Sequence, residues 1–126
     1  MTAVLIAGGR DYVLGLTHFL WLDGLHAKHC FTEVVSGGAA GADTGGEVWA
    51  RRRGVTVKRF DADWSLGKRA GPARNERMAS YVASLPAPGL VALFPGGHGT
   101  YSMDRFATKL GLRIERFAAT DRALTK

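Results

Sequence analysis

Residues 90–100 read LVALFPGGHGT, an apolar run followed by a proline, three glycines and a threonine. The run LVALF has the length and composition of a buried strand, and helical spacing of apolar residues follows it to about residue 110. Glycine is entropically costly, so three glycines in one loop indicate positive φ angles or a close approach of the backbone to another group. The stretch predicts a strand, a glycine loop and a helix in succession.

The same succession recurs along the chain and predicts its fold. Strand-length apolar runs occupy residues 3–7, 32–36, 55–60, 90–94 and 112–117, and helical spacing occupies residues 12–29, 42–53, 73–84 and 100–110. Strands this apolar leave no face for water, and their alternation with helices is typical of a parallel sheet covered on both sides. We predict an α/β fold: a single Rossmann-like, three-layer domain over residues 1–126 with a mainly parallel five-stranded sheet.

Composition excludes several classes of protein. No stretch reaches the roughly 18 to 20 apolar residues that span a membrane, and the amino end lacks the basic region of a signal peptide, so we expect a cytoplasmic protein without a membrane partner. The lone Cys30 predicts no disulfide, and we expect it to be buried. His18, His26 and His29 have no acids or thiols at suitable spacing, so we predict neither a metal nor a cofactor.

The charge favours an anionic partner of small size. Lys and Arg total 17 against 11 acidic residues, giving a net charge of +6, but the basic residues are scattered among acids. No long basic run marks a nucleic-acid groove, so small anions are the expected partners and nucleic acid is the weaker alternative. The consecutive apolar residues 19–22 allow either a homodimer contact or burial under the sheet.

Two loops after predicted strands carry small residues that suit phosphate. In open α/β sheets, ligands lie beyond the carboxyl ends of the strands. The candidate ligand-binding residues in these loops are Gly8, Gly9, Arg10, Ser36, Gly37, Gly38, Gly41, Ala42 and Asp43. Asp43 replaces the lysine of a Walker A motif, whereas SxGxxG at 36–41 partly matches a dinucleotide fingerprint, with Asp61 as its ribose-binding acid. Asp43 suits helix capping or a ligand hydroxyl equally, and Glu47 is expected to be solvated.

Two further loops add polar candidates. In KRAGPARNERMA, Pro72 precedes a predicted helix whose first turn contains Arg74 and Asn75, where a positive charge opposes the helix dipole. We predict a forked contact from Arg74 to phosphate or carboxylate; the alternative is a surface salt bridge with Glu76 or Asp63. In the last loop the candidates are Pro95, Gly96, Gly97, Gly99 and Thr100, with Thr100 at the helix start and His98 either on the ligand or in solvent.

Together, the loops resemble the YspA-type branch of the SLOG superfamily, Rossmann-like domains related to the Lonely Guy phosphoribohydrolases and the DNA-processing protein DprA. The resemblance covers nearly the whole chain and rests on AGGRDY, VVSGGAAGADTGGEVWA, DADW...GKRAGPARNERM and LFPGGHGT in that order. It implies a single-domain sensor or enzyme for nucleotides or nucleotide-derived ligands such as ADP-ribose-like molecules, with phosphate on the glycine loops.

The Lonely Guy enzymes, which cleave the N-glycosidic bond of nucleoside monophosphates, resemble this chain at PGGxGT and at an Arg before a Met, here Arg74 and Met78. Their two glutamates beyond the threonine are replaced by Ser102 and Met103. If the chain is a nucleoside 5'-monophosphate N-ribohydrolase, Arg74 would hold phosphate, and Asp43 or Asp104 would stabilise the oxocarbenium ion or activate water.

Three functions follow from these residues, in decreasing order of support. The first is binding of a nucleotide or a nucleotide-derived phosphorylated ribose, such as an ADP-ribose-like molecule. The second is the ribohydrolase, weakened by the missing glutamates. The third is DprA-like binding of single-stranded nucleic acid, which rests on the net charge of +6.

Overall fold

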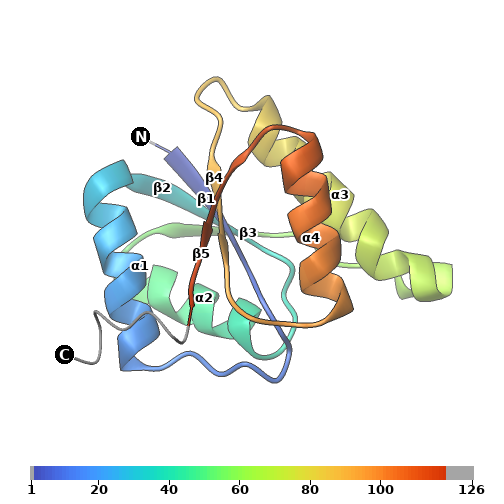
Figure 1. Ribbon diagram of the computed structural model, residues 1–126, viewed down its shortest axis with the longest axis horizontal. Helices are drawn as coiled ribbons and strands as arrows, with labels where there is room; N and C mark the ends of the chain where they lie inside the picture. Colours follow the sequence, from blue (N-terminus) through green and yellow to red (C-terminus); the bar gives the residue numbers. More distant parts are fainter. Residues whose placement is uncertain (1, 119–126) are drawn as a thin grey trace.

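The computed structural model describes residues 2–118, in which five strands alternate with four α-helices and one 3-10 helix (Figure 1). The strands are β1 (Thr2–Ala7), β2 (Phe31–Ser36), β3 (Thr56–Arg59), β4 (Leu90–Leu93) and β5 (Arg113–Arg116). The helices are α1 (Leu16–His29), α2 (Ala42–Arg52), η1 (Trp64–Arg69, the 3-10 helix), α3 (Ala70–Ser84) and α4 (His98–Lys109).

All five strands form one parallel sheet in the order β3-β2-β1-β4-β5. The first three strands step outward from the centre, and the chain then returns to place β4 on the other side of β1, with Val4 opposite both Val34 and Leu90. The predicted Rossmann-like α/β fold with a parallel five-stranded sheet is confirmed. The reversal of strand order creates a topological switch point between β1 and β4, where such sheets bind ligands.

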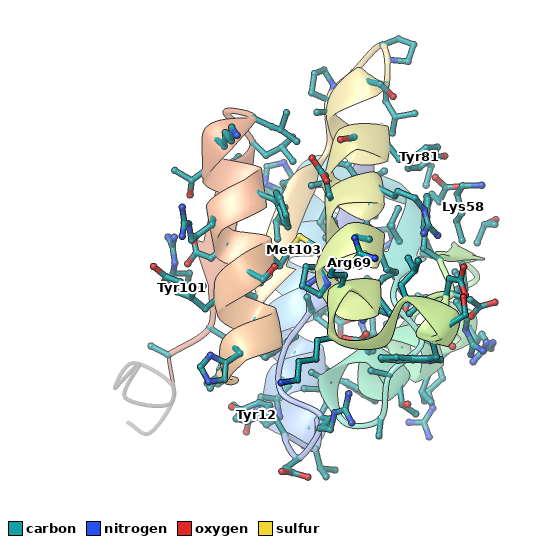
Figure 2. All side chains as sticks on the ribbon, turned by 90° about the vertical axis from the view of Figure 1, so that its right-hand side faces the viewer. Tyr12, Lys58, Arg69, Tyr81, Tyr101 and Met103 are labelled. Atoms are coloured by element: carbon teal, nitrogen blue, oxygen red, sulfur yellow. The ribbon has the colours of Figure 1, made fainter. Side chains whose placement is uncertain are left out.

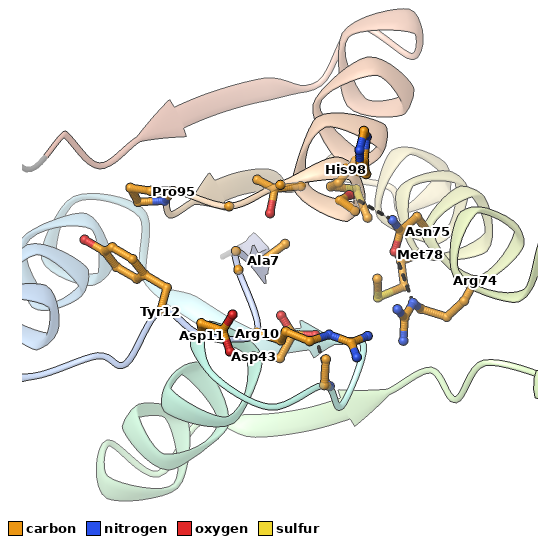
Figure 3. A pocket seen from close by; sticks show the side chains of 18 residues that line it. Ala7, Arg10, Asp11, Tyr12, Asp43, Arg74, Asn75, Met78, Pro95 and His98 are labelled. Carbon is orange, nitrogen blue, oxygen red and sulfur yellow. Dashed lines mark hydrogen bonds between the residues drawn. The ribbon is translucent and has the colours of Figure 1, made fainter. Parts of the chain in front are cut away.

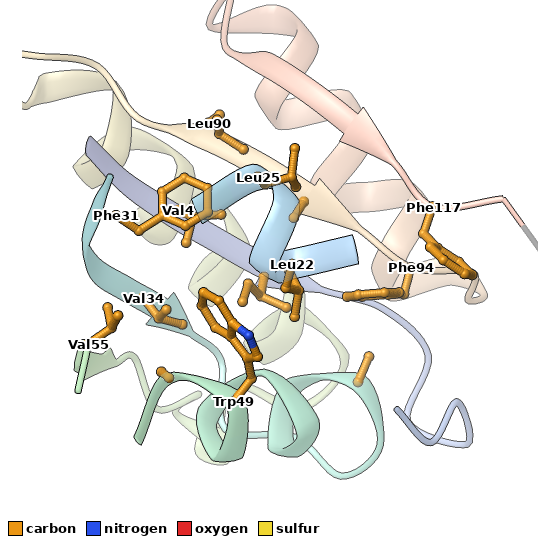
Figure 4. Close-up of a cluster of buried hydrophobic side chains, with 14 residues drawn as sticks. Val4, Leu22, Leu25, Phe31, Val34, Trp49, Val55, Leu90, Phe94 and Phe117 are labelled. Atoms are coloured by element: carbon orange, nitrogen blue, oxygen red, sulfur yellow. The ribbon is translucent and has the colours of Figure 1, made fainter. Parts of the chain in front are cut away.

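Helices cover both faces of the sheet, as Figure 1 shows: α1 and α2 lie on one face, α3 and α4 on the other. Alternation along β1 sends Val4 and Ile6 into the first layer and Leu5 into the second. In the first layer, the fully buried Trp49 of α2 faces Leu22 of α1 (Figure 4). In the second layer, Met103 lies between α3 and α4, which run side by side in Figure 2.

Helices α1 and α3 begin elsewhere than the sequence predicts. Helix α1 begins at Leu16 rather than near residue 12, because a turn closed by the Tyr12 N–H on the Gly9 carbonyl, at 3.1 Å, occupies the preceding segment. Helix α3 begins at Ala70 rather than near residue 73, and η1 lies in the segment between the predicted strand 55–60 and this helix. Pro72 therefore lies in the first turn of α3, where a missing N–H costs no helical hydrogen bond.

Cys30 is exposed, and the prediction that it is buried was wrong. It ends α1 in the left-handed conformation, at φ 54°, with its N–H donated to the His26 carbonyl at 2.8 Å. The core position falls instead to Phe31, whose side chain packs near Trp49. This geometry points the thiol outward because the chain turns at residue 30.

No helix within residues 2–118 has both the length and the apolar character needed to cross a membrane. In the same residues, no three His, Cys, Asp or Glu side chains gather as a metal site would require. Two histidines have structural partners: His26 Nδ1 accepts the Phe31 N–H at 3.0 Å, and His18 Nδ1 accepts the Gly15 N–H at 2.8 Å.

Candidate functional site

A cavity of about 530 Å³ opens at the carboxyl ends of β1 and β4, at the switch point of the sheet (Figure 3). It is lined by predicted ligand residues from all four of the segments that follow predicted strands: Gly8, Gly9, Arg10, Asp43, Arg74, Asn75, Pro95, Gly96, Gly97, Gly99 and Thr100. Ala7, Asp11, Tyr12, Ala39, Met78, His98 and Met103 complete the lining. The structure therefore brings most of the predicted residues to one place.

The floor of the cavity is a seam, the line of contact between the loop after β1 (residues 8–10) and the loop after β4 (residues 95–97). The Gly9 N–H donates to the Pro95 carbonyl at 2.8 Å, which continues the pairing of β1 with β4 past the strand ends. A Cβ on Gly96 would lie 2.6 Å from the Gly9 nitrogen and would collide with the Thr100 hydroxyl. Only bare backbone fits at this seam, which explains part of the glycine density of the sequence.

The amino end of α4 opens into the cavity. The helix begins at His98 with Gly97 as its N-cap, so the expectation that Thr100 starts the helix was wrong; Thr100 lies within the first turn. No side chain caps this end, and the first N–H that bonds back is that of Tyr101, to the Gly97 carbonyl at 3.0 Å. The backbone N–H groups before it, with the positive end of the helix dipole, form an anion-binding arrangement.

The loop before α2, residues 37–41, packs against the loop after β1, residues 8–10. Gly41 has a φ of 75°, and a Cβ there would collide with the carbonyl oxygens of Gly9 and Arg10. The Ala42 N–H donates to the Gly9 carbonyl at 3.1 Å. Gly41, Ala42 and the buried Ser36 therefore lie outside the cavity lining, although the sequence placed them among the ligand residues.

Arg74 is buried on the cavity wall. Its Nη1 donates to the Gly37 carbonyl at 2.6 Å and its Nε to Asn75 Oδ1 at 3.1 Å, while Asn75 Nδ2 donates to the Gly99 carbonyl at 3.2 Å. No salt bridge joins Arg74 to a carboxylate within residues 2–118, so the alternative of a surface ion pair was wrong. Burial lowers the pKa of Arg74, with a partial opposing effect from the charge of Asp43. This wall thus holds a buried cation without a directly paired anion.

Asp43 is the one buried carboxylate of the cavity lining. It lies in the first turn of α2, and its Oδ2 accepts the Ala39 N–H at 3.2 Å. Burial raises the pKa of Asp43 to about 6, against the opposing effects of the hydrogen bond from Ala39 and the charge of Arg74. A carboxyl group that titrates this close to neutrality can take up or release a proton during binding or reaction.

Glu47 lies one helical turn beyond Asp43 and is 2% exposed, so the expectation of a solvated side chain was wrong. Its carboxylate accepts the Ser36 hydroxyl at 2.7 Å and two bonds from Arg59, at 2.6 and 3.2 Å. The pairing of Ser36 with Arg59 across β2 and β3 brings both donors under α2. Glu47 is therefore part of the framework rather than of the cavity.

The cavity mouth carries exposed polar side chains and one aromatic wall. Arg10, Asp11 and His98 are exposed there, with Tyr12 half-buried opposite Pro95 (Figure 3). The Tyr12 ring stacks on Phe94, with centroids 5.9 Å apart, and its hydroxyl lies 3.0 Å from His18 Nε2. Sequence reasoning missed Tyr12, whose position at the end of AGGRDY was the only available signal.

Asp104, the alternative hydrolase carboxylate, lies outside the cavity lining. It is on α4 and pairs with Arg116 of β5 through two hydrogen bonds, at 2.7 and 3.2 Å. Asp43 is the candidate carboxylate that the fold brings next to Arg74.

A second cavity of about 450 Å³ adjoins the first. Its own lining includes Gly37, Gly38, Asp61 and Trp64, and it shares three residues with the first cavity: Arg10, Ala39 and Arg74. Gly37 and Gly38 were predicted ligand residues, whereas Trp64 was not singled out. The two shared arginines thus stand at a boundary between two hollows.

Comparison with known proteins places these features in a family. The model of the YspA, cpYpsA-related SLOG family matches residues 2–67. The Gene 61 protein of Mycobacterium phage D29 is 36% identical over 128 aligned residues, which cover 93% of this chain and 97% of the phage protein.

Among solved structures, DNA processing protein A (DprA) from Streptococcus pneumoniae is similar, with a TM-score of 0.65 at 14% identity. The match covers 95% of this chain and 52% of the DprA chain, so this chain spans about half the length of DprA. At that identity the likeness shows a shared fold.

Proposed function

This chain belongs to the YspA, cpYpsA-related SLOG family, and we propose that it binds a nucleotide or a nucleotide-derived phosphorylated ribose in the cavity at the carboxyl ends of β1 and β4. The membership confirms the resemblance seen in the sequence. One observation carries the proposal: the uncapped amino end of α4 and the buried Arg74, which has no directly paired carboxylate in residues 2–118, line the same cavity. Both are suited to a phosphate group.

The rest of the lining supports a sugar attached to that phosphate. Asn75 and Asp43 offer polar groups for hydroxyls, and the side chains of Met78 and Met103 supply apolar surface. A volume of about 530 Å³ falls in the range of small-molecule sites, about 300–1,000 Å³. This mixture of convergent polar groups and apolar wall is typical of a pocket for a small organic phosphate.

The experiment is a thermal-shift panel with AMP, ADP, ADP-ribose, NAD and ribose 5-phosphate, followed by titration calorimetry of the stabilising compounds. A ligand at 100 times its Kd stabilises the folded state by about 2.7 kcal/mol, which produces a clear shift for a domain of this size. No shift from any of these compounds would contradict the proposal.

Two substitutions locate the binding site. Arg74→Ala removes charged hydrogen bonds worth about 1.5–3 kcal/mol, so we expect roughly ten- to a hundredfold weaker binding. Gly97→Val adds a side chain where open space now lies and should abolish binding in a folded protein. The control is Arg51→Ala, an equal change of charge on an exposed arginine of α2 outside the cavity. If Arg74→Ala and Gly97→Val both bound like the parent, the site would be wrong.

A second candidate function is hydrolysis of a nucleoside 5'-monophosphate to free base and ribose 5-phosphate. The observation that favours it is Asp43, whose pKa of about 6 suits acid-base chemistry near neutral pH. In this reaction Arg74 holds the phosphate, and Asp43 activates water or stabilises the oxocarbenium ion. Chromatography of AMP incubated with the protein tests it: base should be released by the parent and not by Asp43→Asn. Binding without released base would exclude this reaction for AMP.

Binding of single-stranded nucleic acid is the remaining candidate, and the net charge of +6 supports it. The similar fold of a protein titled DNA processing protein A makes the test worthwhile. Nucleic-acid binding weakens steeply with salt, because phosphate contacts release counterions. Binding of an oligonucleotide with a steep salt dependence, together with no small-ligand shift, would support this candidate over the first.

A further inference from the structure

The Tyr12 ring is the aromatic wall of the cavity at the carboxyl ends of β1 and β4, and the proposed function gives it no role. Tyr12 is half-buried and stands on the opposite side of this cavity from Arg74 (Figure 3). Its ring stacks on the buried Phe94, with centroids 5.9 Å apart and an interplanar angle of 28°. The part of the ring that is not covered is therefore available on the cavity side.

His18 of α1 is held in one tautomer. Its Nδ1 accepts the Gly15 N–H at 2.8 Å, so this nitrogen carries no proton. Burial lowers the pKa of His18, against a smaller opposing effect of the hydrogen bond from Gly15, and this favours a neutral imidazole at pH 7. A neutral imidazole that has no proton on Nδ1 carries its proton on Nε2.

This tautomer fixes the direction of the contact between His18 and Tyr12. His18 Nε2 lies 3.0 Å from the Tyr12 hydroxyl, and as the protonated nitrogen it donates while the hydroxyl oxygen accepts. The two rings meet edge to face, with centroids 5.2 Å apart, and His18 also packs 4.8 Å from the Phe117 ring. Helix α1 therefore anchors the hydroxyl end of the tyrosine side chain.

The backbone of Tyr12 is fixed from the same side as its ring. The Tyr12 N–H donates to the Gly9 carbonyl at 3.1 Å, and the Gly9 N–H donates to the Pro95 carbonyl at 2.8 Å. Because Pro95 follows Phe94, one short segment after β4 supports both the backbone turn and the stacked ring. A ring ordered in advance loses little conformational freedom when a ligand binds to it.

A fixed aromatic ring on a cavity wall suits a flat group of the ligand. Stacking of a base on an aromatic side chain is worth about 1–3 kcal/mol, and a bare sugar phosphate has no flat ring that could use it. The phosphate is assigned to the amino end of α4 and to Arg74, so the base of a nucleotide would lie toward the opposite wall.

We propose that Tyr12 selects ligands that carry an aromatic base over the bare sugar phosphate, and that His18 is the positioning residue that holds the Tyr12 ring for this contact. This inference rests on the proposed function and assigns one end of its ligand to one wall of the cavity.

Titration calorimetry with AMP and ribose 5-phosphate tests the role of Tyr12, because the two probes differ only in the base. Tyr12→Leu should weaken AMP binding about tenfold and leave ribose 5-phosphate unchanged. Tyr12→Phe keeps the ring and should retain most of the AMP affinity. The matched control is Tyr101→Leu, the same change at an exposed tyrosine of α4 outside the cavity lining, and it should leave both affinities unchanged.

His18→Gln tests the positioning role. A glutamine at this position can still accept the Gly15 N–H, as in a capping box, so α1 keeps its cap while Tyr12 loses its anchor. AMP binding should weaken several-fold, with ribose 5-phosphate binding and the Tm unchanged, whereas a merely structural role would lower the Tm or weaken both probes. Nitrogen-15 NMR of the parent imidazole at pH 7 should show the proton of His18 on Nε2.

The outcomes separate this inference from the proposed function. If Tyr12→Leu leaves AMP binding unchanged, or weakens both probes equally, selection by Tyr12 is overturned and the proposed function stands. Unchanged AMP binding by His18→Gln, or a proton on Nδ1 of His18, would overturn the positioning role. If the parent binds neither probe, the inference is overturned, and the proposed function falls with it only if no other compound of the thermal-shift panel binds.

Discussion

Asp43 and Glu47 lie one turn apart on α2, both buried, yet their surroundings shift their acidities in opposite directions. Burial raises the pKa of Asp43 to about 6. Glu47 also loses hydration, but hydrogen bonds from Arg59 and Ser36 outweigh that loss and lower its pKa. Hydrogen bonds within the fold therefore compensate Glu47 for its lost hydration. Asp43, beside the cavity, is compensated only in part.

The arginines repeat this contrast. Arg59 makes two hydrogen bonds to Glu47, whereas Arg74 bonds a carbonyl and an amide oxygen without a salt bridge inside residues 2–118. A framework ion pair is complete without ligand. Arg74 and Asp43 are buried but form no salt bridge with each other, so neither charge is neutralised by a direct partner. This is the physical basis for proposing the cavity, rather than the turn that holds Glu47, as the binding site.

The largest effect that would sharpen this contrast is expected from Asp43→Asn. The shift of its pKa from 3.8 to about 6 corresponds to roughly 3 kcal/mol of destabilisation of the charged form, which the neutral amide avoids at pH 7. A raised carboxyl pKa means that the folded state binds the proton more tightly, so stability is lost as pH rises from about 4 through about 6. Urea unfolding should show Asp43→Asn more stable than the parent at pH 7 and equal to it below pH 4. A variant less stable than the parent at pH 7 would contradict the view that burial destabilises the charged form of Asp43.

Glu47→Gln should act in the opposite direction and with a smaller effect. The amide cannot accept from both Ser36 and Arg59 as the carboxylate does, and we expect a loss of about 2 kcal/mol at pH 7. Because Arg59 is half exposed, water can partly replace the lost partner, which keeps the loss below that of a fully buried pair.

The pH dependence of Glu47 distinguishes it from Asp43. A lowered pKa gives stability that is present above the ordinary value of 4.5 and is lost as pH falls through the lower folded value. The difference between parent and Glu47→Gln should therefore shrink in acid, measured in the same urea series. Equal loss at every pH would indicate a packing effect instead of a charge effect.

Much of the fold could be predicted from the sequence because it follows from local periodicity. Five apolar runs and four helical patterns fix a parallel sheet, and the sheet then brings the loops at its carboxyl edge together. The gathering of Gly9, Arg74 and Gly96 around one cavity needed only this rule. Whether these residues bind a ligand stays a prediction.

What could not be predicted depends on contacts between distant segments. The burial of Glu47 requires Ser36 and Arg59 to be neighbours across β2 and β3, and no local pattern encodes that register. Cys30 was expected in the core from its residue type, but its left-handed backbone turns it outward. Trp64 is a single aromatic residue between a predicted strand and a predicted helix, and no local pattern indicates that it lines the second cavity.

The smallest expected effect on stability comes from Arg51→Ala. It tests whether Glu47 is stabilised by specific hydrogen bonds or only by nearby positive charge. Arg51 contacts the same carboxylate by one bond of 3.3 Å, from the next turn of α2, and its side chain is 60% exposed. Such a pair contributes less than about 0.5 kcal/mol, because solvent screens it and its side chain loses entropy. Arg51→Ala should therefore leave the urea midpoint nearly unchanged, whereas Arg59→Ala, the same change of charge at the doubly bonded position, should lower it clearly. Equal losses for the two variants would mean that Glu47 is stabilised by the total positive charge nearby and not by the two hydrogen bonds from Arg59. The contrast between Glu47 and Asp43 would then rest on burial alone.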